Sequence, residues 1–143
     1  RLHLIPGIKK YFSNNLKGKR FALWGLAFKP NTDDIREAPA LYMIEALTKE
    51  GATVCAFDPE GIENVKNQIG DIIDYSENQY DALKNADALI IATEWNEFRT
   101  PDFSKIAANL KNKVIFDGRN LFDLSAIREL GFHYESVGRA IIN

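Results

Sequence analysis

The sequence has 143 residues, of which 45% are hydrophobic and 27% are charged, and its formal net charge is -2. This length suits one domain with a substantial core, and the composition excludes an intrinsically disordered chain. The small negative charge gives no electrostatic reason to expect nucleic acid or an acidic membrane surface as a partner.

The first 18 residues differ in pattern from the rest of the chain. They carry apolar side chains at helical spacing after a break at Pro6-Gly7, which predicts the tail of a helix that belongs to an upstream region. The chain starts at Arg1 and not at a methionine, so we expect a fragment of a longer protein. We therefore divide it into a linking helix end with its connector, residues 1–18, and a compact domain, residues 19–143.

From residue 19 onward, strand patterns alternate with helical patterns. Six short apolar segments predict strands, over residues 20–26, 53–57, 71–75, 88–93, 113–116 and 132–137. Helical spacing and end signals predict helices between them, over residues 40–50, 61–68, 78–84, 103–110 and 125–130, with a loop over 94–101. Asp123 or Ser125 is the expected cap of the last helix.

This alternation predicts right-handed crossovers and a parallel sheet covered on both faces. The expected fold is α/β, a Rossmann-like doubly wound sheet of about six strands in the order 3-2-1-4-5-6. In that order the first, fourth and fifth strands are neighbours. The loops that follow them should converge on one crevice at the carboxyl edge of the sheet.

These three loops have unusual polar content, over residues 29–36, 94–99 and 117–120. The crevice should hold Lys29 and Arg119, with Arg36 or Arg99 as a further cation. An arginine fork and a compact lysine charge suit a phosphate or pyrophosphate. The loop after Gly25 lacks the second and third glycines of a dinucleotide fingerprint, so side chains should hold the phosphates.

Each cation also has a purely structural interpretation. Lys29 precedes Pro30, which favours an extended and solvated lysine. Arg36 could have no role beyond pairing with a nearby carboxylate. Arg119 could form a salt bridge with Asp117. Spacing by itself leaves these alternatives open.

Other polar and aromatic residues near the loops are assigned mainly to structure. Asp58 stands where a dinucleotide-binding domain places its ribose acid, but without the glycines we interpret it as a turn residue. Asp34 suits a helix N-terminus, and Asp33 could fix a neighbouring cation. Trp24 belongs to the core, whereas Trp95 either lines the crevice or caps the core.

The single cysteine, Cys55, excludes an intramolecular disulfide and a cysteine-based zinc site, and it favours a cytoplasmic setting. Because it lies in an apolar strand pattern, we interpret it as a buried hydrophobe. His3 and His133 lack metal-ligand partners, so no metal is expected. No apolar run approaches the roughly 20 residues of a membrane-spanning helix, so no membrane partner is expected.

Four spaced motifs carry a resemblance to a known family. They are GLAFKPNTDDIREAPA from Gly25, FDP from Phe57, TEW from Thr93 and DGRN from Asp117. Together they resemble the C-terminal domain of the UDP-glucose and GDP-mannose dehydrogenase family, over nearly the whole chain from residue 19. The first motif is most similar to members that act on UDP-glucose.

The resemblance implies an NAD-dependent oxidoreductase of polysaccharide biosynthesis that turns a sugar's primary alcohol into a carboxylate in two steps. It implies that Phe28 and Lys29 contact the UDP of a UDP-sugar, that Arg119 binds the nucleotide sugar, and that Arg36 reaches toward NAD. NAD would be held mainly by the protein's own N-terminal domain. The catalytic cysteine would lie upstream, so this chain would hold no catalytic residue and would be inactive alone. The whole enzyme would be a homodimer or a higher oligomer.

Two alternatives stay open. The substrate could be GDP-mannose or a UDP-N-acetylhexosamine, because the residues that discriminate sugars would lie largely upstream. From another class, the chain could be a stand-alone regulatory α/β module, such as a phosphoacceptor receiver or a flavin carrier. A receiver needs an aspartate after the third strand, where this chain has Tyr75-Ser76.

Overall fold

In the computed structural model, which describes residues 3–143, six strands form one sheet. Every neighbouring pair is parallel and the order is β3-β2-β1-β4-β5-β6, which confirms the predicted doubly wound fold. The strands are β1 (Arg20–Trp24), β2 (Thr53–Phe57), β3 (Asp74–Tyr75), β4 (Ala88–Ile91), β5 (Val114–Asp117) and β6 (His133–Glu135).

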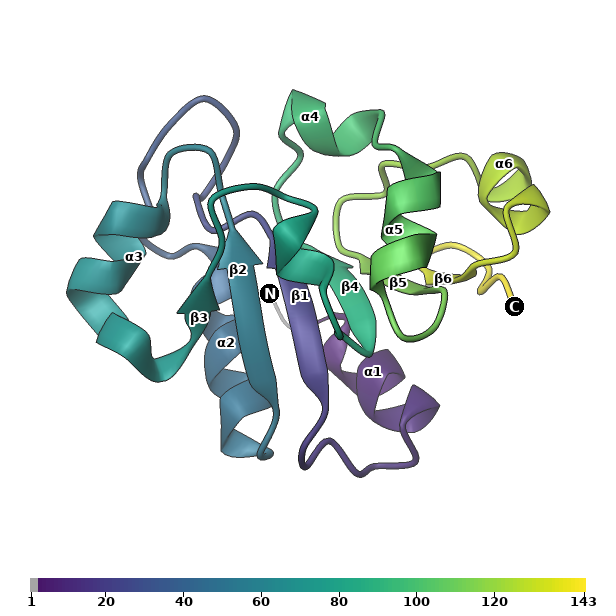
Figure 1. Ribbon diagram of the computed structural model, residues 1–143, viewed down its shortest axis with the longest axis horizontal. Helices are drawn as coiled ribbons and strands as arrows, with labels where there is room; N and C mark the ends of the chain where they lie inside the picture. The colour runs from purple at the N-terminus through teal and green to yellow at the C-terminus, as the bar shows by residue number, and fades with distance from the viewer. Residues whose placement is uncertain (1–2) are drawn as a thin grey trace.

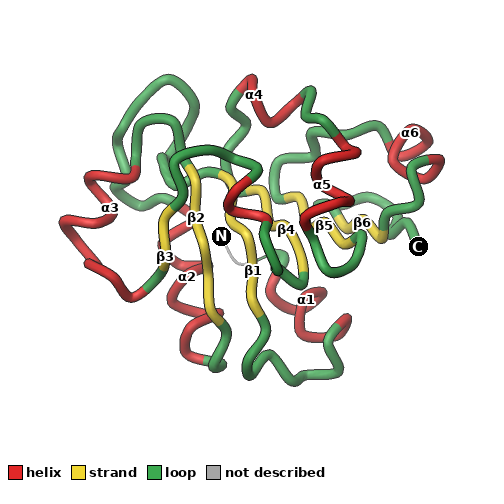
Figure 2. The backbone as a smooth tube through the Cα atoms, viewed as in Figure 1, coloured by secondary structure: helices red, strands yellow, loops and turns green. Residues whose placement is uncertain are grey.

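Helices cover both faces of this sheet (Figures 1 and 2). In Figure 1, α2 passes behind the strands and α5 lies in front of them. The α-helices are α1 (Ile5–Tyr11), α2 (Pro39–Lys49), α3 (Ile62–Ile69), α4 (Asn96–Arg99), α5 (Phe103–Asn109) and α6 (Leu124–Glu129). Two 3₁₀ turns complete the described elements, η1 (Gly70–Ile72) and η2 (Asp81–Leu83). None of the helices in residues 3–143 is long and apolar enough to cross a bilayer.

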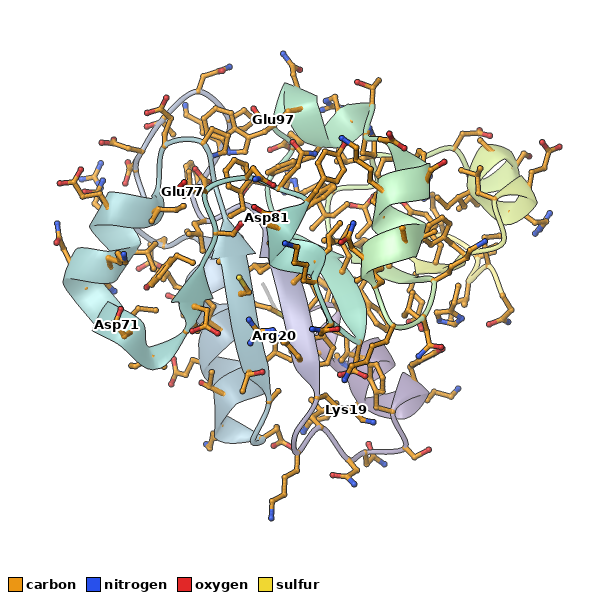
Figure 3. The ribbon with its side chains drawn as sticks, viewed as in Figure 1. Lys19, Arg20, Asp71, Glu77, Asp81 and Glu97 are labelled. Atoms are coloured by element: carbon orange, nitrogen blue, oxygen red, sulfur yellow. The ribbon has the colours of Figure 1, made fainter. Side chains whose placement is uncertain are left out.

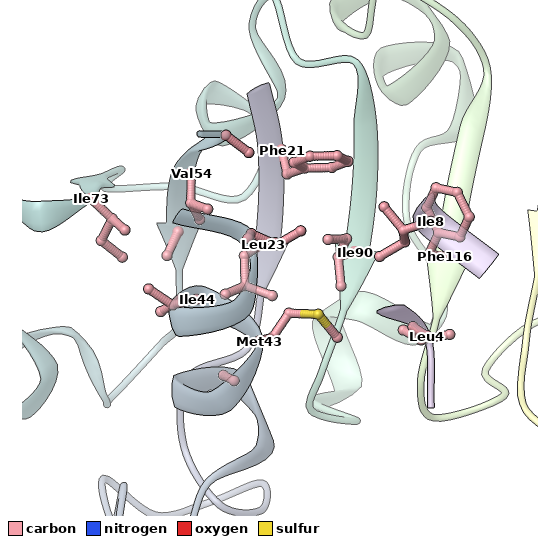
Figure 4. Close-up of a cluster of buried hydrophobic side chains, with 14 of the residues drawn as sticks. Leu4, Ile8, Phe21, Leu23, Met43, Ile44, Val54, Ile73, Ile90 and Phe116 are labelled. Carbon is pink, nitrogen blue, oxygen red and sulfur yellow. The ribbon is translucent and has the colours of Figure 1, made fainter. Parts of the chain in front are cut away.

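The central strand β1 builds two cores because its side chains alternate between the faces of the sheet. Phe21 and Leu23 pack with α1 and α2 in one core, which Figure 4 shows around Met43 and Ile90. Trp24 packs in the other core, on the side of α4 and α5. As predicted, Trp24 is fully buried, and so are the apolar residues of β4.

The first helix, α1, is fastened to the sheet. Ile8 has no exposed surface and lies in the same core as Phe116 (Figure 4). The predicted break at Pro6-Gly7 is wrong, because both residues lie in the first turn of α1. A proline is tolerated there, since the first amides of a helix have no partner within the helix.

Three predicted elements differ from the structure around the sheet's edge and the last loops. The strand expected over 71–75 shortens to Asp74–Tyr75, since residues 70–72 form η1 and only two pairs with β2 remain. The helix expected over 78–84 shortens to η2. The loop expected over 94–101 contains a single helical turn, α4. Each is a short segment in which tertiary contacts outweigh local propensity.

The carboxyl edge of the sheet lies at the top of Figure 1, where the arrow of β2 points. Figure 3 shows Lys19 and Arg20 toward the opposite, amino end and Glu97 on α4 beside the carboxyl edge. At the amino end, the Asp87 carboxylate accepts a hydrogen bond from the Arg20 amide at 2.8 Å. The strand order places the candidate site at the other end, on the loops at the top of the sheet.

Candidate functional site

The loops after β1, β4 and β5 meet at the carboxyl edge, as the strand order requires. Direct bonds join them. Thr93, after β4, donates its hydroxyl to the Ala27 carbonyl at 2.9 Å. The Gly118 amide, after β5, donates to the Ile91 carbonyl at 2.9 Å. The three loops therefore form one connected surface.

Asp58 is the buried anchor of this surface. Its Oδ2 accepts hydrogen bonds from the Leu26 and Ala27 amides, at 2.7 and 2.9 Å, and from the Trp95 indole at 3.1 Å. Its Oδ1 accepts from the amides that follow Pro59, at 2.8 and 2.7 Å. Only 2% of Asp58 is exposed. One carboxylate thus ties together the loops after β1, β2 and β4.

The hydrogen bonds that Asp58 accepts decide whether this edge of the sheet can bind a dinucleotide in the usual way. In a dinucleotide-binding domain the carboxylate at this position accepts hydrogen bonds from the ribose hydroxyls. Here both oxygens of Asp58 already accept hydrogen bonds from N–H groups of the protein. The helix that follows β1 begins at Pro39, which has no amide hydrogen to offer a phosphate. These residues do not fit NAD in the manner of a glycine-rich cradle.

The loop after β1 has a fixed and unusual backbone. Gly25 has φ of +104°, and a Cβ added there would stand 2.6 Å from the Thr93 amide nitrogen. Beyond it, the Phe28 amide donates to the Asp34 carbonyl at 2.7 Å and closes the loop on itself. The closed loop presents Phe28, half exposed, and Lys29, also exposed, at its surface.

Arg36 lies at the end of this loop and is paired locally. Its Nε and Nη2 donate to the two oxygens of Asp34 at 3.0 and 2.9 Å. These bonds, together with a bond from the Arg36 amide and the nearby charge of Lys29, lower the pKa of Asp34 to about 2. The fork is bidentate, while the Arg36 side chain is largely solvent-exposed.

Arg119 follows β5 and is held by its backbone and its side chain. Its amide donates to Asp117 at 2.8 Å, and its guanidinium pairs with Glu94, from the loop after β4. Asp117 is fully buried, and its other oxygen accepts a hydrogen bond from the Leu121 amide at 2.7 Å. Arg119 therefore forms its salt bridge with Glu94 and not with Asp117.

Arg119 also lines a cavity of about 230 Å³ between the sheet edge and the start of α2. The cavity is lined by His3, Leu4, Pro39, Met43, Ile91, Ala92, Gly118, Arg119 and Val137. Arg36 lines a different hollow, of about 460 Å³, between α2 and α3. The sheet edge therefore brings Arg119 and an apolar cavity together, and it separates them from Arg36.

Sequence reasoning missed the contacts that Thr93 and Glu94 make at this edge, and it left Trp95 open between the crevice and the core. Trp95 is buried against Asp58, so it anchors the core side of the surface. Glu94 and Thr93 belong to the TEW motif, and this motif could have identified them as contributors to the site. Cys55 is buried, as predicted, and burial raises the pKa of its thiol, which disfavours the nucleophilic thiolate. Within residues 3–143 no group of three or more potential ligands could hold a metal ion.

Comparisons with known proteins show the family to which the chain is related. The sequence profile of the UDP-glucose/GDP-mannose dehydrogenase family, UDP binding domain, matches residues 22–124. A UDP-glucose 6-dehydrogenase of Pseudomonas aeruginosa is 40% identical in an alignment of 141 positions that covers 95% of this chain and 31% of that protein. The TuaD UDP-glucose 6-dehydrogenase of Bacillus subtilis is 38% identical over 99% of this chain and 31% of its own length.

Solved structures give the same result. A UDP-glucose dehydrogenase from Pyrobaculum islandicum superposes with a TM-score of 0.80 at 31% identity, over 96% of this chain and 29% of that one. An NDP-N-acetyl-D-galactosaminuronic acid dehydrogenase from Methanosarcina mazei has the same TM-score at 25% identity, over 95% of this chain and 28% of that one. The chain thus spans under a third of the length of these relatives.

Proposed function

The chain belongs to the UDP-glucose/GDP-mannose dehydrogenase family and matches its UDP-binding domain, and from this premise we propose that it binds the UDP part of UDP-glucose within an NAD-dependent UDP-glucose 6-dehydrogenase. The observation that carries the proposal is the position of Arg119, fixed beside a cavity at the carboxyl edge. Lys29 and Phe28 supply a second, exposed part of the nucleotide site from the loop after β1.

The contribution of this domain to the reaction is positional. UDP lies remote from the carbon that is oxidised to give UDP-glucuronate, so its binding energy orients the sugar without taking part in bond making. NAD, bound mainly by the N-terminal domain, would accept the hydride, and Arg36 would approach it from this side. The catalytic cysteine would lie upstream, and the burial of Cys55 and the raised pKa of its thiol support this assignment.

The first 18 residues would be the end of the helix that links the two halves of the enzyme, followed by its connector to the compact domain. Leu4 and Ile8 are buried in the core with α2 and β5. A linking helix attached in this way would transmit a defined orientation to the domain. We expect the isolated chain to have no dehydrogenase activity, and the whole enzyme to be at least a homodimer.

Calorimetry of UDP-glucose binding to the full-length enzyme tests the proposal. Arg119→Ala and Lys29→Ala should each raise the Kd at least about tenfold, since a charge-assisted hydrogen bond contributes about 1.5–3 kcal/mol. Arg128→Ala on α6 and Lys84→Ala after η2 are matched controls, because both side chains are exposed and lie outside the three loops. Unchanged affinity in both site variants would contradict the assignment.

A second candidate substrate is a UDP-N-acetylhexosamine. The M. mazei enzyme, whose described substrate is an N-acetylated sugar nucleotide, superposes as well as the UDP-glucose dehydrogenase of P. islandicum. This domain would bind the shared nucleotide in either case. Steady-state assays with UDP-glucose, UDP-N-acetylglucosamine and GDP-mannose in parallel distinguish the candidates through kcat/KM.

A further inference from the structure

Arg119 stands on a short loop, residues 118–121, that a second segment holds from outside. This second segment, residues 136–142, follows β6 and is called the clasp here. Its far end returns to β6, because the Ile142 and Tyr134 amides each donate to the other's carbonyl, at 2.9 and 2.8 Å. The clasp is therefore closed at its base and can act as a fixed support.

The first link between clasp and loop is a reciprocal pair of hydrogen bonds. Asn120 donates its Nδ2 to the Val137 carbonyl at 2.9 Å, and its Oδ1 accepts from the Val137 amide at 2.8 Å. Asn120 has φ of +55°, a conformation that asparagine tolerates better than most residues. Both Val137 and Arg119 line the same cavity. The pair thus holds the loop at the cavity that Arg119 lines.

The second link runs through buried groups. The Tyr134 hydroxyl donates to Asp117 at 2.5 Å, on the carboxylate that also receives the Arg119 amide. Tyr134 is fully buried, and burial together with the Asp117 charge raises the pKa of its hydroxyl. The hydroxyl therefore stays protonated and keeps its donor role at working pH.

Arg139 connects this buried link to the clasp. Its Nη2 donates to the Tyr134 hydroxyl at 2.9 Å, and its Nη1 donates to the Phe122 carbonyl at 3.0 Å. Its Nε donates to the Ser136 hydroxyl at 2.9 Å. One guanidinium thus holds β6, the residue that follows the Arg119 loop and the start of the clasp.

We propose that Asn120, Tyr134 and Arg139 are positioning residues for nucleotide binding, because together they fix the loop from which Arg119 meets the diphosphate. The inference rests on the proposed function, in which Arg119 contacts UDP. None of the three needs to touch the ligand. A loop that is already held in its binding conformation loses less conformational freedom when the ligand binds, so support of the loop is expected to be visible in affinity.

The sharpest test is Asn120→Gly in the full-length enzyme, with UDP as the probe in calorimetry. Glycine accepts the positive φ without strain, so the substitution removes the two bonds to Val137 and little else. Those bonds are exposed, and we expect little loss of stability. The Kd of UDP and the KM of UDP-glucose should rise about fivefold, as expected for the loss of about one hydrogen bond's worth of support. The kcat and the KM of NAD should stay within about twofold of wild type.

Asn85→Gly is the matched control. Asn85 has φ of +60° but lies before β4, at the amino end of the sheet. The same chemical change there should leave every binding constant unchanged. Tyr134→Phe is the second variant, because it keeps the buried ring and deletes the hydroxyl that joins Asp117 to Arg139. It should also raise the Kd of UDP about fivefold.

The outcomes separate the inference from the proposed function. If Asn120→Gly and Tyr134→Phe both leave the Kd of UDP within about twofold while Arg119→Ala weakens binding, the positioning role is wrong and the proposed function stands. A fall in the number of binding sites at constant Kd would report partial unfolding and would likewise overturn it. If Arg119→Ala leaves UDP binding intact, the proposed function fails and the inference with it.

Discussion

Arg119 donates its Nε to Oε2 of Glu94 at 2.9 Å and directs its Nη2 to the same oxygen. The two residues follow different strands, β5 and β4, and both are partly exposed. Arg119, the main cation of the candidate site, is therefore already paired with a carboxylate of the protein. A diphosphate that approaches Arg119 meets this negative charge as a competitor.

Glu94→Gln should therefore strengthen UDP binding. The amide keeps the shape and one acceptor oxygen but removes the charge that repels the phosphates, and exposed charge pairs contribute up to about 1 kcal/mol. We expect the Kd of UDP to fall about threefold at low salt, with a smaller gain at high salt because the repulsion is screened. Calorimetry at two salt concentrations measures this, with the exposed Glu129→Gln on α6 as control. Weaker binding by Glu94→Gln would show that the carboxylate supports the ligand-binding position of Arg119.

The strand order and the meeting of three loops were predictable because they depend on local patterns. Apolar runs marked β1, β2, β4 and β5, and parallel strands joined by short helices favour few arrangements. The partner of Arg119 was not predictable in this way. Glu94 lies 25 residues away on another loop. The nearer candidate, Asp117, is buried, and its oxygens accept hydrogen bonds from the backbone amides of Arg119 and Leu121.

The same limit applies to Asp58. The FDP motif indicated a turn, and two of its five hydrogen bonds do come from the next residues of the turn. The other three come from the loops after β1 and β4, which only the folded sheet brings near. The short strand β3 is a related case, since its two residues depend on pairing with β2 and not on an apolar pattern.

Loss of the Asp58 carboxylate should destabilise the chain strongly. Asp58→Ala leaves the N–H donors of three loops, four backbone amides and the Trp95 indole, without this acceptor. We therefore expect the free energy of unfolding to fall by at least about 3 kcal/mol. Asp58→Asn should be nearly as harmful, because its NH₂ group would face N–H donors. Urea denaturation measures the change. Asp123→Ala removes a helix cap with one side-chain bond and should cost only about 1 kcal/mol. Equal effects of the two alanine variants would contradict the anchoring role.

Gly25→Ala tests the contact between the loops after β1 and β4. A methyl group there would meet the Thr93 backbone, and φ of +104° is unfavourable for alanine, so we expect a loss of about 3 kcal/mol in the free energy of unfolding. Gly138→Ala is the control, because Gly138 also has a positive φ, of +69°, but nothing lies within 4 Å of its added Cβ. It should cost about 1 kcal/mol, from backbone strain alone. A small effect at Gly25 would show that the two loops can separate at little cost.

The pair of Arg36 and Asp34 should be stable across the whole neutral range. The pKa of Asp34 is lowered from 3.8 to about 2 in the folded chain, so its contribution to stability is fully present above pH 3.8 and is lost as the pH falls toward 2. The carboxyl carbon shift of Asp34, followed by NMR titration, measures this pKa. Arg36→Gln should return the pKa toward 3.8, because the side-chain bonds from Arg36 are the largest cause of the shift. Lys29→Gln should raise it less, because Lys29 acts only through its charge. A pKa that stays near 2 in Arg36→Gln would mean that the loop backbone holds Asp34 ionised, and that Arg36 is not committed to it when a ligand approaches.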